Sequence, residues 1–327
     1  MPKLTVKKEI FSLKSPFRIA HGTRYNSEVI VVEITDENIS GKGEAVPYKR
    51  YNETCESVIE QIKSVQNKIN KGIDLKTLQK IMPNGAARNA IDCALWDLKA
   101  KQQKKHIWEI AGLPKPKTIN TVFTLVIDSP DNMAREAKEK TKLFSTLKLK
   151  LAGDEIDKDR MLAVHNAAPN SKIIIDANES WNEKLYLNLI GACQKSNVQM
   201  IEQPFKASQD EILATLPRPI DICADEACHV TSDLANLVGK YDMVNIKLDK
   251  TGGLTEAINL FKEAKKLNFK IMVGCMVGTS LSMRPAYYIA QMADLVDIDG
   301  PLLLKEDRDG GLIYTGSRVS EGTLDNT

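Results

Sequence analysis

The sequence has no excess of charge of either sign. Its 327 residues include 45 lysines and arginines and 43 aspartates and glutamates, which gives a formal net charge of +2. This balance offers no electrostatic reason to expect nucleic acid or an anionic membrane as a partner. No apolar run approaches the roughly 18 residues of a membrane-spanning helix, and the N-terminal residues lack a secretory apolar segment. We therefore expect no nucleic-acid partner and no membrane partner.

Cysteine and histidine are also scarce, with six and four residues. The cysteines form no Cys-x-x-Cys pair, and most lie in apolar stretches, so we expect buried, reduced thiols, which suit the cytoplasm. The histidines show no zinc-ligand spacing, which argues against a zinc enzyme. No Gly-x-Gly-x-x-Gly fingerprint follows the early strands, which argues against dinucleotide binding.

The composition is that of a globular protein, with 43% apolar and 27% charged residues. At roughly 150 residues per domain, the length predicts about two domains, and one large barrel with a smaller domain also fits.

The first hundred or so residues predict a small α+β domain, because strands come first and helices follow. Two prolines in Gly112–Pro116 break helix continuity and mark the expected boundary. The expected elements are strands at 4–13 and 27–34, turn residues at 36–43, and helices at 53–69 and 85–103.

Beyond this boundary, short apolar runs recur, and each is followed by an amphipathic, helix-like stretch. The starts of successive runs differ by 22 to 28 residues. Eight strands with about 25 residues per βα unit are typical of a parallel eight-stranded barrel. A flat, doubly wound sheet is the alternative, but it usually has fewer strands. The runs are 121–126, 147–151, 173–175, 198–201, 220–223, 243–248, 271–273 and 295–298.

Charged residues stand at the C-terminal ends of six of these runs, where the active site of such a barrel lies. A single charge of this kind is as easily a solvated surface residue. Six strands that share the feature, each inside an apolar run, favour one common site. The residues are Lys148 and Lys150, Asp176, Glu202, Asp225, Lys247, and Asp297 and Asp299.

Asp176, Glu202 and Asp225 follow neighbouring strands, and three bare carboxylates would repel one another. Oxygen donors without histidine or cysteine suit Mg²⁺, with Mn²⁺ as second choice. Lys150 and Lys247 come from strands four places apart in a ring of eight. We therefore expect the two lysines to face each other across the barrel mouth.

A lysine acts as a base near neutral pH only if its pKa falls below its usual value of about 10.4. A divalent cation, a second lysine and partial burial all lower that pKa. Two opposed bases around a metal-held carboxylate predict removal of a proton from one side of an α-carbon and delivery to the other. The metal stabilises the enediolate, and the product is the epimer or racemate.

Asp297 and Asp299 lie on the strand that is opposite the metal site in the ring. We expect their partner to be a cation at the far end of the substrate, such as an ammonium group. The alternative is a solvated turn before Gly300-Pro301.

Together these motifs resemble the enolase superfamily, in its muconate-lactonising-like branch, over nearly the whole chain. That resemblance implies a (β/α)₇β TIM-like barrel over residues 116–303, an N-terminal α+β capping domain over 1–115, and a C-terminal segment, 304–327, that returns to the cap. The motifs are Lys148-Leu149-Lys150, Asp176-Ala177-Asn178, Glu202-Gln203-Pro204, Asp225-Glu226, and Asn245-Ile246-Lys247-Leu248 followed by Gly252-Gly253.

Within that branch the sequence is similar to the dipeptide epimerases, most closely those acting on L-Ala-D/L-Glu. The resemblance implies a cytoplasmic isomerase of cell-wall (murein) peptide recycling that works as a homo-oligomer. It implies Asp176, Glu202 and Asp225 as Mg²⁺ ligands, Lys150 and Lys247 as the two bases, Lys148 beside the metal-bound carboxylate, Asp297 and Asp299 at the dipeptide amino terminus, Arg24 at a glutamyl side chain, and Thr124 in contact with substrate.

Other functions on the same scaffold stay open at this point. An o-succinylbenzoate synthase or a muconate cycloisomerase would use the same lysines and metal, but neither substrate carries a cation for Asp297 and Asp299. A non-catalytic barrel is disfavoured because the set of ligands and bases is complete. Many relatives have Met-x-Glu-Ser or Met-x-Glu-Thr where this chain has 276–280 (MVGTS), and the missing acid slightly favours an acidic substrate side chain.

Overall fold

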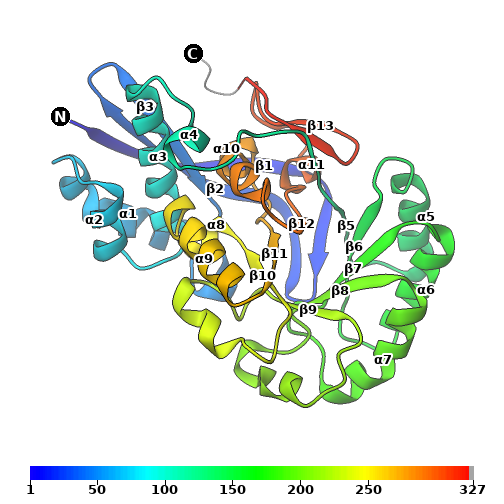
Figure 1. The fold of residues 1–327 in the computed structure, drawn as a ribbon. Helices are drawn as coiled ribbons and strands as arrows, with labels where there is room; N and C mark the ends of the chain where they lie inside the picture. Colours follow the sequence, from blue (N-terminus) through cyan, green and yellow to red (C-terminus); the bar gives the residue numbers. More distant parts are fainter. Residues whose placement is uncertain (324–327) are drawn as a thin grey trace.

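An eight-stranded parallel sheet forms the centre of the computed structural model, which describes residues 1–323 (Figure 1). Strands adjacent in sequence are adjacent in space, and Val122 N donates to Val296 O at 3.1 Å, so the sheet curls until its two edges meet. Each predicted run overlaps a strand, which confirms the barrel. The strands are β5 (Phe123–Leu125), β6 (Thr146–Lys150), β7 (Lys172–Asp176), β8 (Val198–Glu202), β9 (Asp221–Ala224), β10 (Met243–Ile246), β11 (Lys270–Val273) and β12 (Leu295–Val296).

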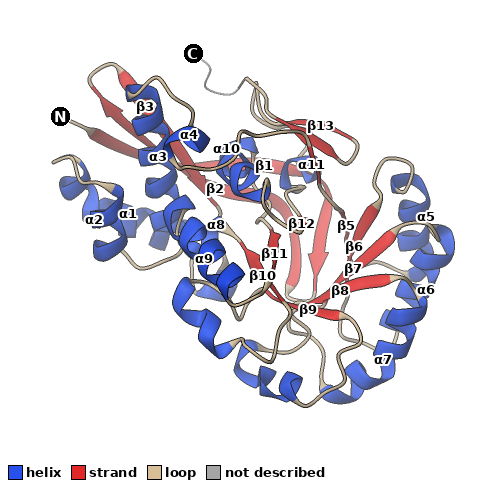
Figure 2. Cartoon of the chain, viewed as in Figure 1, coloured by secondary structure: helices blue, strands red, loops and turns tan. Residues whose placement is uncertain are grey.

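Helices cover the outside of this sheet (Figure 2). After β8 and β9 the chain forms only 3₁₀ turns, η2 (Ala207–Ala214) and η3 (Thr231–Asn236). The helix α5 begins with Ser129 as N-cap, whose hydroxyl accepts from Asn132 N, and with proline in its first turn. The helices are α5 (Pro130–Lys140), α6 (Asp157–Ala167), α7 (Glu183–Lys195), α8 (Leu248–Thr251), α9 (Leu254–Lys266), α10 (Ser280–Ala290) and α11 (Gly300–Leu303).

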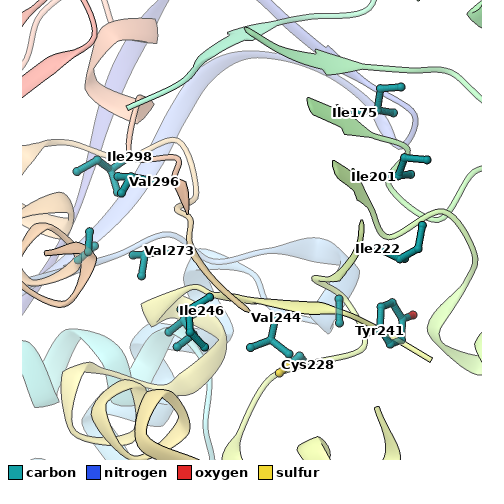
Figure 3. Packing of buried hydrophobic residues seen from close by; sticks show 14 of the residues in the cluster. Ile175, Ile201, Ile222, Cys228, Tyr241, Val244, Ile246, Val273, Val296 and Ile298 are labelled. Atoms are coloured by element: carbon teal, nitrogen blue, oxygen red, sulfur yellow. The ribbon is translucent and has the colours of Figure 1, made fainter. Parts of the chain in front are cut away.

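Side-chain alternation along the strands separates the core from the site. One face of each strand packs into the main apolar cluster together with helix residues, and Ile175, Ile201 and Ile222 of this cluster are labelled in Figure 3. The other face points into the barrel. Its lower residues form a separate buried cluster, the apolar floor, and its upper residues carry the charges. The floor consists of Val122, Ile174, Met200, Cys223, Met243 and Met272.

The N-terminal residues form an antiparallel sheet with helices packed on one side. As predicted, the first two strands and both long helices are present. The turn predicted over 36–43 is wrong for most of its length, because 39–43 pairs with β2 as part of a third strand. The elements are β1 (Lys3–Ile19), β2 (Gly22–Asp36), β3 (Ile39–Ala45), η1 (Lys49–Tyr51), α1 (Cys55–Ile69), α2 (Leu75–Ile81), α3 (Ala86–Gln102) and α4 (Ile107–Ile110).

Buried hydrogen bonds join this N-terminal part to the short helix α8 and the glycine that follows it, directly after β10. Asp249 Oδ1 accepts from Val46 N and from Asn89 Nδ2, both at 2.9 Å. The Arg88 guanidinium donates to the carbonyl oxygens of Thr251 and Gly252 at 2.6 and 3.1 Å. The cap is therefore fixed next to the strand that carries Lys247.

The C-terminal segment contacts both parts of the chain. Leu304 forms a bridge with Leu13, and Lys305 N donates to Ser12 O at 2.8 Å. Further on, β13 (Ile313–Thr315) and β14 (Arg318–Ser320) form a small sheet with β4 (Ile119–Asn120) at the start of the barrel. Residues 324–327 of the predicted segment 304–327 lie outside the described residues.

The six cysteines are free thiols, five of them buried and Cys275 partly exposed, in agreement with the prediction. Across residues 1–323, no helix has both the length and the apolar character needed to cross a membrane.

Packing of β3 on α3 generates a prediction. A Cβ added at Gly43 would lie 2.2 Å from the Ala90 carbonyl oxygen, so β3 would have to move away from the helix. We expect Gly43→Ala to lower the free energy of unfolding by about 1–3 kcal/mol, measured by urea titration. Gly191→Ala in α7 is the control, because its Cβ meets nothing within 4 Å. Equal stability of the two variants would contradict this account of the packing.

Candidate active site

The barrel mouth brings together the eight charged residues predicted from the strand ends. The parallel register explains this, because Lys150 pairs with Asp176, and Asp176 with Glu202, at the same level of three neighbouring strands. Two charged residues not predicted as site members, Glu226 and Lys250, join them, and none of the ten is more than 7% exposed. The barrel-mouth cluster consists of Lys148, Lys150, Asp176, Glu202, Asp225, Glu226, Lys247, Lys250, Asp297 and Asp299.

Lys148 lies between carboxylates from both sides of the mouth. Its Nζ is 2.6 Å from Glu202, 3.1 Å from Asp176 and 2.7 Å from Asp297. Asp297, which follows β12, is therefore not as remote from the three predicted metal ligands as its ring position suggested, because the long side chain of Lys148 contacts both. Asp297 already has one cationic partner, so a substrate ammonium would be its second.

Lys150 and Lys247 lie at opposite ends of the carboxylate row. Lys150 Nζ donates to Asp176 and, at 3.2 Å, to Asn178 Oδ1. Lys247 Nζ is 2.6 Å from Asp225 and 3.9 Å from Glu202. This placement agrees with two lysines that approach the centre of the mouth from different sides.

Lys250 is a site residue that the sequence analysis did not assign. Its ammonium group is fully buried and donates to Asp225 Oδ1 at 2.6 Å and to the Asn245 carbonyl at 2.9 Å. The amide of Asn245 in turn donates to Glu202 Oε1 at 2.6 Å. Lys250 thus fixes the orientation of Asp225 from behind. The sequence offered one signal for this role: Lys250 stands three residues after Lys247 and shortly before Gly252-Gly253.

Thr124 and Asp299 meet where the first and last strands join. Thr124 is level with Lys148 in the β5–β6 register, and its backbone N–H donates to Asp299 Oδ2 at 2.7 Å. Both residues are buried. The two predicted substrate-binding residues therefore share one wall of the mouth.

Arg24 lies in the cap and lines a cavity of about 860 Å³ together with His21, Tyr48 and Arg50. Its guanidinium stacks over the Tyr48 ring, 4.9 Å from the ring centroid. Burial raises the pKa of Tyr48 to about 12, and the nearby Lys247 acts in the opposite direction. Tyr48 thus lies against Arg24 and close enough to Lys247 to be affected by its charge, a placement that the sequence did not reveal.

Burial and mutual repulsion change the acidity of the carboxyl groups. Burial, followed by Asp176, raises the pKa of Glu202 to about 7. Burial together with Asp225 raises the pKa of Glu226 to about 8. Burial also acts to raise the pKa of Asp225, but Lys247 and Lys250 hold it well below its usual range.

For Lys247 and Lys148, the pKa shifts in the opposite direction to the lowering that the sequence analysis expected for a lysine base. Burial acts to lower the pKa of Lys247, but Asp225 and Glu202 raise it well above its usual value. Lys148 behaves in the same way beside Asp297 and Glu202. The pKa of these two lysines is raised because their ammonium groups face carboxylates. A cation bound to those carboxylates would remove the cause.

The donors at the mouth fit a hard divalent cation. Fully ionised, the barrel-mouth cluster has six carboxylates and four ammonium groups, a formal charge of −2 that one divalent cation cancels. Burial, followed by a neighbouring carboxylate, raises the pKa values of Glu202, Glu226 and Asp299. Asp176, Glu202 and Asp225 offer only oxygen, which suits Mg²⁺ or Mn²⁺.

Two families match the chain. Residues 1–112 match the family described as "Mandelate racemase / muconate lactonizing enzyme, N-terminal domain". Residues 132–314 match the family described as "Enolase C-terminal domain-like".

Two curated relatives share the same percentage identity with this chain, over aligned stretches of different length. The chain is 44% identical over 319 residues to the L-Ala-D/L-Glu epimerase of Escherichia coli K12, covering 96% of this chain and 98% of that protein. It is also 44% identical over 294 residues to an N-acetyl-D-glutamate racemase of a Pseudoalteromonas species, covering 89% and 92%.

Solved structures agree with the fold. An enolase family member from Agrobacterium tumefaciens, described as homologous to dipeptide epimerases, was solved with sodium and L-Ala-L-Glu. It has a TM-score of 0.96 and 44% identity over 98% of both chains. The dipeptide epimerase of Enterococcus faecalis V583, solved with Mg and L-Leu-L-Tyr, has a TM-score of 0.92 and 30% identity over 98% of this chain and 96% of that one.

The raised carboxyl pKa values predict how a cation affects stability. Glu202, with a pKa of about 7, binds a proton below that pH and must lose it to bind metal. We expect millimolar Mg²⁺ to raise the Tm more at pH 8 than at pH 5.5. At 100 times the Kd, the gain in the free energy of unfolding is about 2.7 kcal/mol. Calorimetry with and without EDTA measures the difference. Glu202→Gln is the control and should not respond, whereas an unresponsive wild-type chain at pH 8 would contradict the metal site.

Proposed function

Since the chain belongs to the enolase superfamily, in the branch of mandelate racemase and muconate-lactonising enzymes, we propose that it is a Mg²⁺-dependent dipeptide epimerase. The substrate is L-Ala-D/L-Glu or a similar L-Ala-Xaa dipeptide, and the reaction inverts the α-carbon of the C-terminal residue. The observation that carries this proposal is the placement of two buried lysines at opposite ends of one carboxylate row, with two further acids on the facing wall.

The metal ligands in this proposal are Asp176, Glu202 and Asp225. When bound there, Mg²⁺ supplies electrostatic stabilisation of the negative charge that develops on the substrate carboxylate. Mn²⁺ is the expected substitute, since it accepts the same oxygen donors. Lys148, which contacts Glu202 and Asp176, is positioned to share a substrate carboxylate with the metal.

Lys150 and Lys247 are the proposed bases. One Nζ accepts the α-proton from one side of the substrate, while the other Nζ holds the proton that it delivers to the opposite side. In the reverse direction the two lysines exchange these roles. A lysine that accepts a proton must begin neutral. When a metal binds the carboxylate partner of the lysine, the ion pair between them weakens, which lowers the pKa of the lysine and favours its neutral form.

The other end of the dipeptide fits the wall formed by Asp297, Asp299 and Thr124. A substrate ammonium there would meet two buried carboxyl groups, one of which already contacts Lys148. Arg24, in the cavity beside Tyr48, offers a cation to an acidic side chain at the C-terminal residue. These assignments make the substrate a dipeptide with a free amino terminus and an acidic second residue.

An N-acetylglutamate racemase is the second candidate, because one of the two relatives at 44% identity bears that name. The same lysines and metal would serve it, but an N-acetyl group has no positive charge for Asp297 and Asp299. The o-succinylbenzoate synthase and muconate cycloisomerase alternatives have the same weakness. The buried acids therefore favour the dipeptide.

We further propose that the protein acts in the cytoplasm, in recycling of cell-wall peptides, as a homo-oligomer. The proposed division of the chain is a cap over 1–115, a barrel over 116–303 and a returning segment over 304–327. The contact of Leu304 with Leu13 supports the last part of this division.

The two candidate substrates give a direct test. We expect ¹H NMR in deuterated water with Mg²⁺ to show exchange of the glutamyl α-proton in L-Ala-L-Glu, and much slower exchange in N-acetyl-L-glutamate. The double variant Asp297→Asn, Asp299→Asn should lose about 10²-fold or more in kcat/KM for the dipeptide, because a buried charge partner of its ammonium is removed. Exchange in N-acetyl-L-glutamate alone would establish the racemase instead. No exchange in any Ala-Xaa dipeptide would exclude the epimerase.

Replacement of each proposed base should separate the two half-reactions. We expect Lys150→Ala and Lys247→Ala to lose about 10²–10⁴-fold in epimerisation, and each variant to retain proton exchange with one epimer only. Lys240→Ala is the matched control, a buried lysine paired with Asp210 and Glu211 away from the mouth. It should affect stability and leave kcat unchanged. Equal exchange of both epimers in either base variant would contradict the two-base assignment.

A further inference from the structure

One buried carboxylate of the barrel, Glu179, meets two separate loops of the cap. Its side chain is 2% exposed and lies just beyond β7. Arg50 of η1 donates from Nε to Oε2 at 2.5 Å and from Nη2 to Oε1 at 2.8 Å. The backbone N–H of Ala207 also donates to Oε1, at 2.9 Å. Both carboxylate oxygens therefore accept hydrogen bonds. A bidentate arginine–carboxylate pair of this kind fixes the relative orientation of the two side chains as well as their distance.

The second cap loop reaches the same carboxylate through His21, in the turn between β1 and β2. Its Nε2 lies 3.9 Å from Glu179 Oε2. His21 and Arg50 come from segments far apart in the sequence, yet both line the 860 Å³ cavity that contains Arg24 and Tyr48. Glu179 thus lies next to both cap loops that line this cavity, the one with His21 and the one with Arg50.

The backbone at Glu179 connects this contact to the proposed chemistry. Asn178 and Glu179 have φ values of 42° and 63°, two consecutive non-glycine residues in the left-handed region. Such a conformation persists where the surrounding contacts determine it, and it occurs preferentially at functional sites. Asn178 N donates to Asp176 Oδ1 at 3.0 Å, and Asn178 Oδ1 accepts from Lys150. A shift of the backbone at Glu179 would therefore also move Asn178 relative to Asp176 and Lys150, the proposed metal ligand and base.

A metal site is a competing interpretation of the same residues. His21, Glu179 and Glu226 each offer a ligand atom within 4.8 Å of the others, and Glu226 Oε2 is buried without a hydrogen-bond partner. However, the guanidinium of Arg50 already occupies both oxygens of Glu179 and stays charged at any ordinary pH. A cation would have to displace it, so the cluster is better suited to docking of the cap.

We propose that Glu179 is a positioning residue that docks both cap loops over the barrel mouth and thereby sets the affinity for substrate. It does not touch the reacting atoms. The effect on affinity rests on the proposed epimerase function, whereas the effect on the loops does not.

The test compares Glu179→Gln and Arg50→Gln with Arg18→Gln. Arg18 is the matched control because it forms another cap-to-barrel ion pair, with Asp128 at 3.4 Å, in which both side chains are exposed. We expect hydrogen exchange over residues 19–26 and 47–53 to accelerate about tenfold in the first two variants, with no change in the control. Arg50→Gln removes a half-exposed side chain, so it keeps the test valid if Glu179→Gln fails to fold.

Steady-state kinetics of the same variants provide the second measurement. We expect KM for the dipeptide to rise about tenfold in both variants with kcat within about twofold, and the double variant to be no worse than either single one. Unchanged exchange in the two loops overturns the proposal, and so does a loss in kcat at constant KM, which would place Glu179 in the chemistry. If the wild-type chain epimerises no dipeptide, the proposed function fails and the exchange data alone decide the docking role.

Discussion

Burial of like charge is the constraint on which this structure depends. Six carboxyl groups lie within the barrel mouth, and four ammonium groups lie among them. Asp225 has two lysines, Lys247 and Lys250, at hydrogen-bond distance, and they hold its pKa low against the effect of burial. Glu226 has no lysine among its hydrogen-bond partners, and burial together with Asp225 raises its pKa to about 8. Removal of one partner from such an arrangement leaves an uncompensated buried charge. The ionised mouth carries an excess of negative charge that a bound divalent cation would cancel.

The strand geometry makes this concentration of charge possible. Along β6, the leucines pack outward into the main apolar cluster, while Lys148 and Lys150 point inward. Below the charges, the apolar floor closes the barrel, so the charged layer has solvent on one side only. The same alternation that builds the core therefore supplies an enclosed site in which electrostatic interactions are strong.

The cap completes the enclosure through polar contacts. Asp249 and Arg88 fix it at the loop after β10, and Glu179 receives Arg50 and His21 above β7. These contacts lie at two separate places on the rim, after β10 and after β7. Substrate recognition in the proposed reaction thus depends on a cap that is fixed to the barrel at both places.

The sequence by itself determined the barrel and eight of the ten charged residues at its mouth, because apolar runs at a regular interval with charged ends specify both the strands and the residues at their C-terminal ends. It also predicted Lys150 and Lys247 on different sides, since the ring order follows the chain order. Only the tertiary structure decided that Lys148 reaches Asp297, that Lys250 lies behind Asp225, and that the cap meets the barrel at Glu179. Those contacts join residues 25 to 149 positions apart. They depend on side-chain length and loop conformation, neither of which has a periodic signature in the sequence.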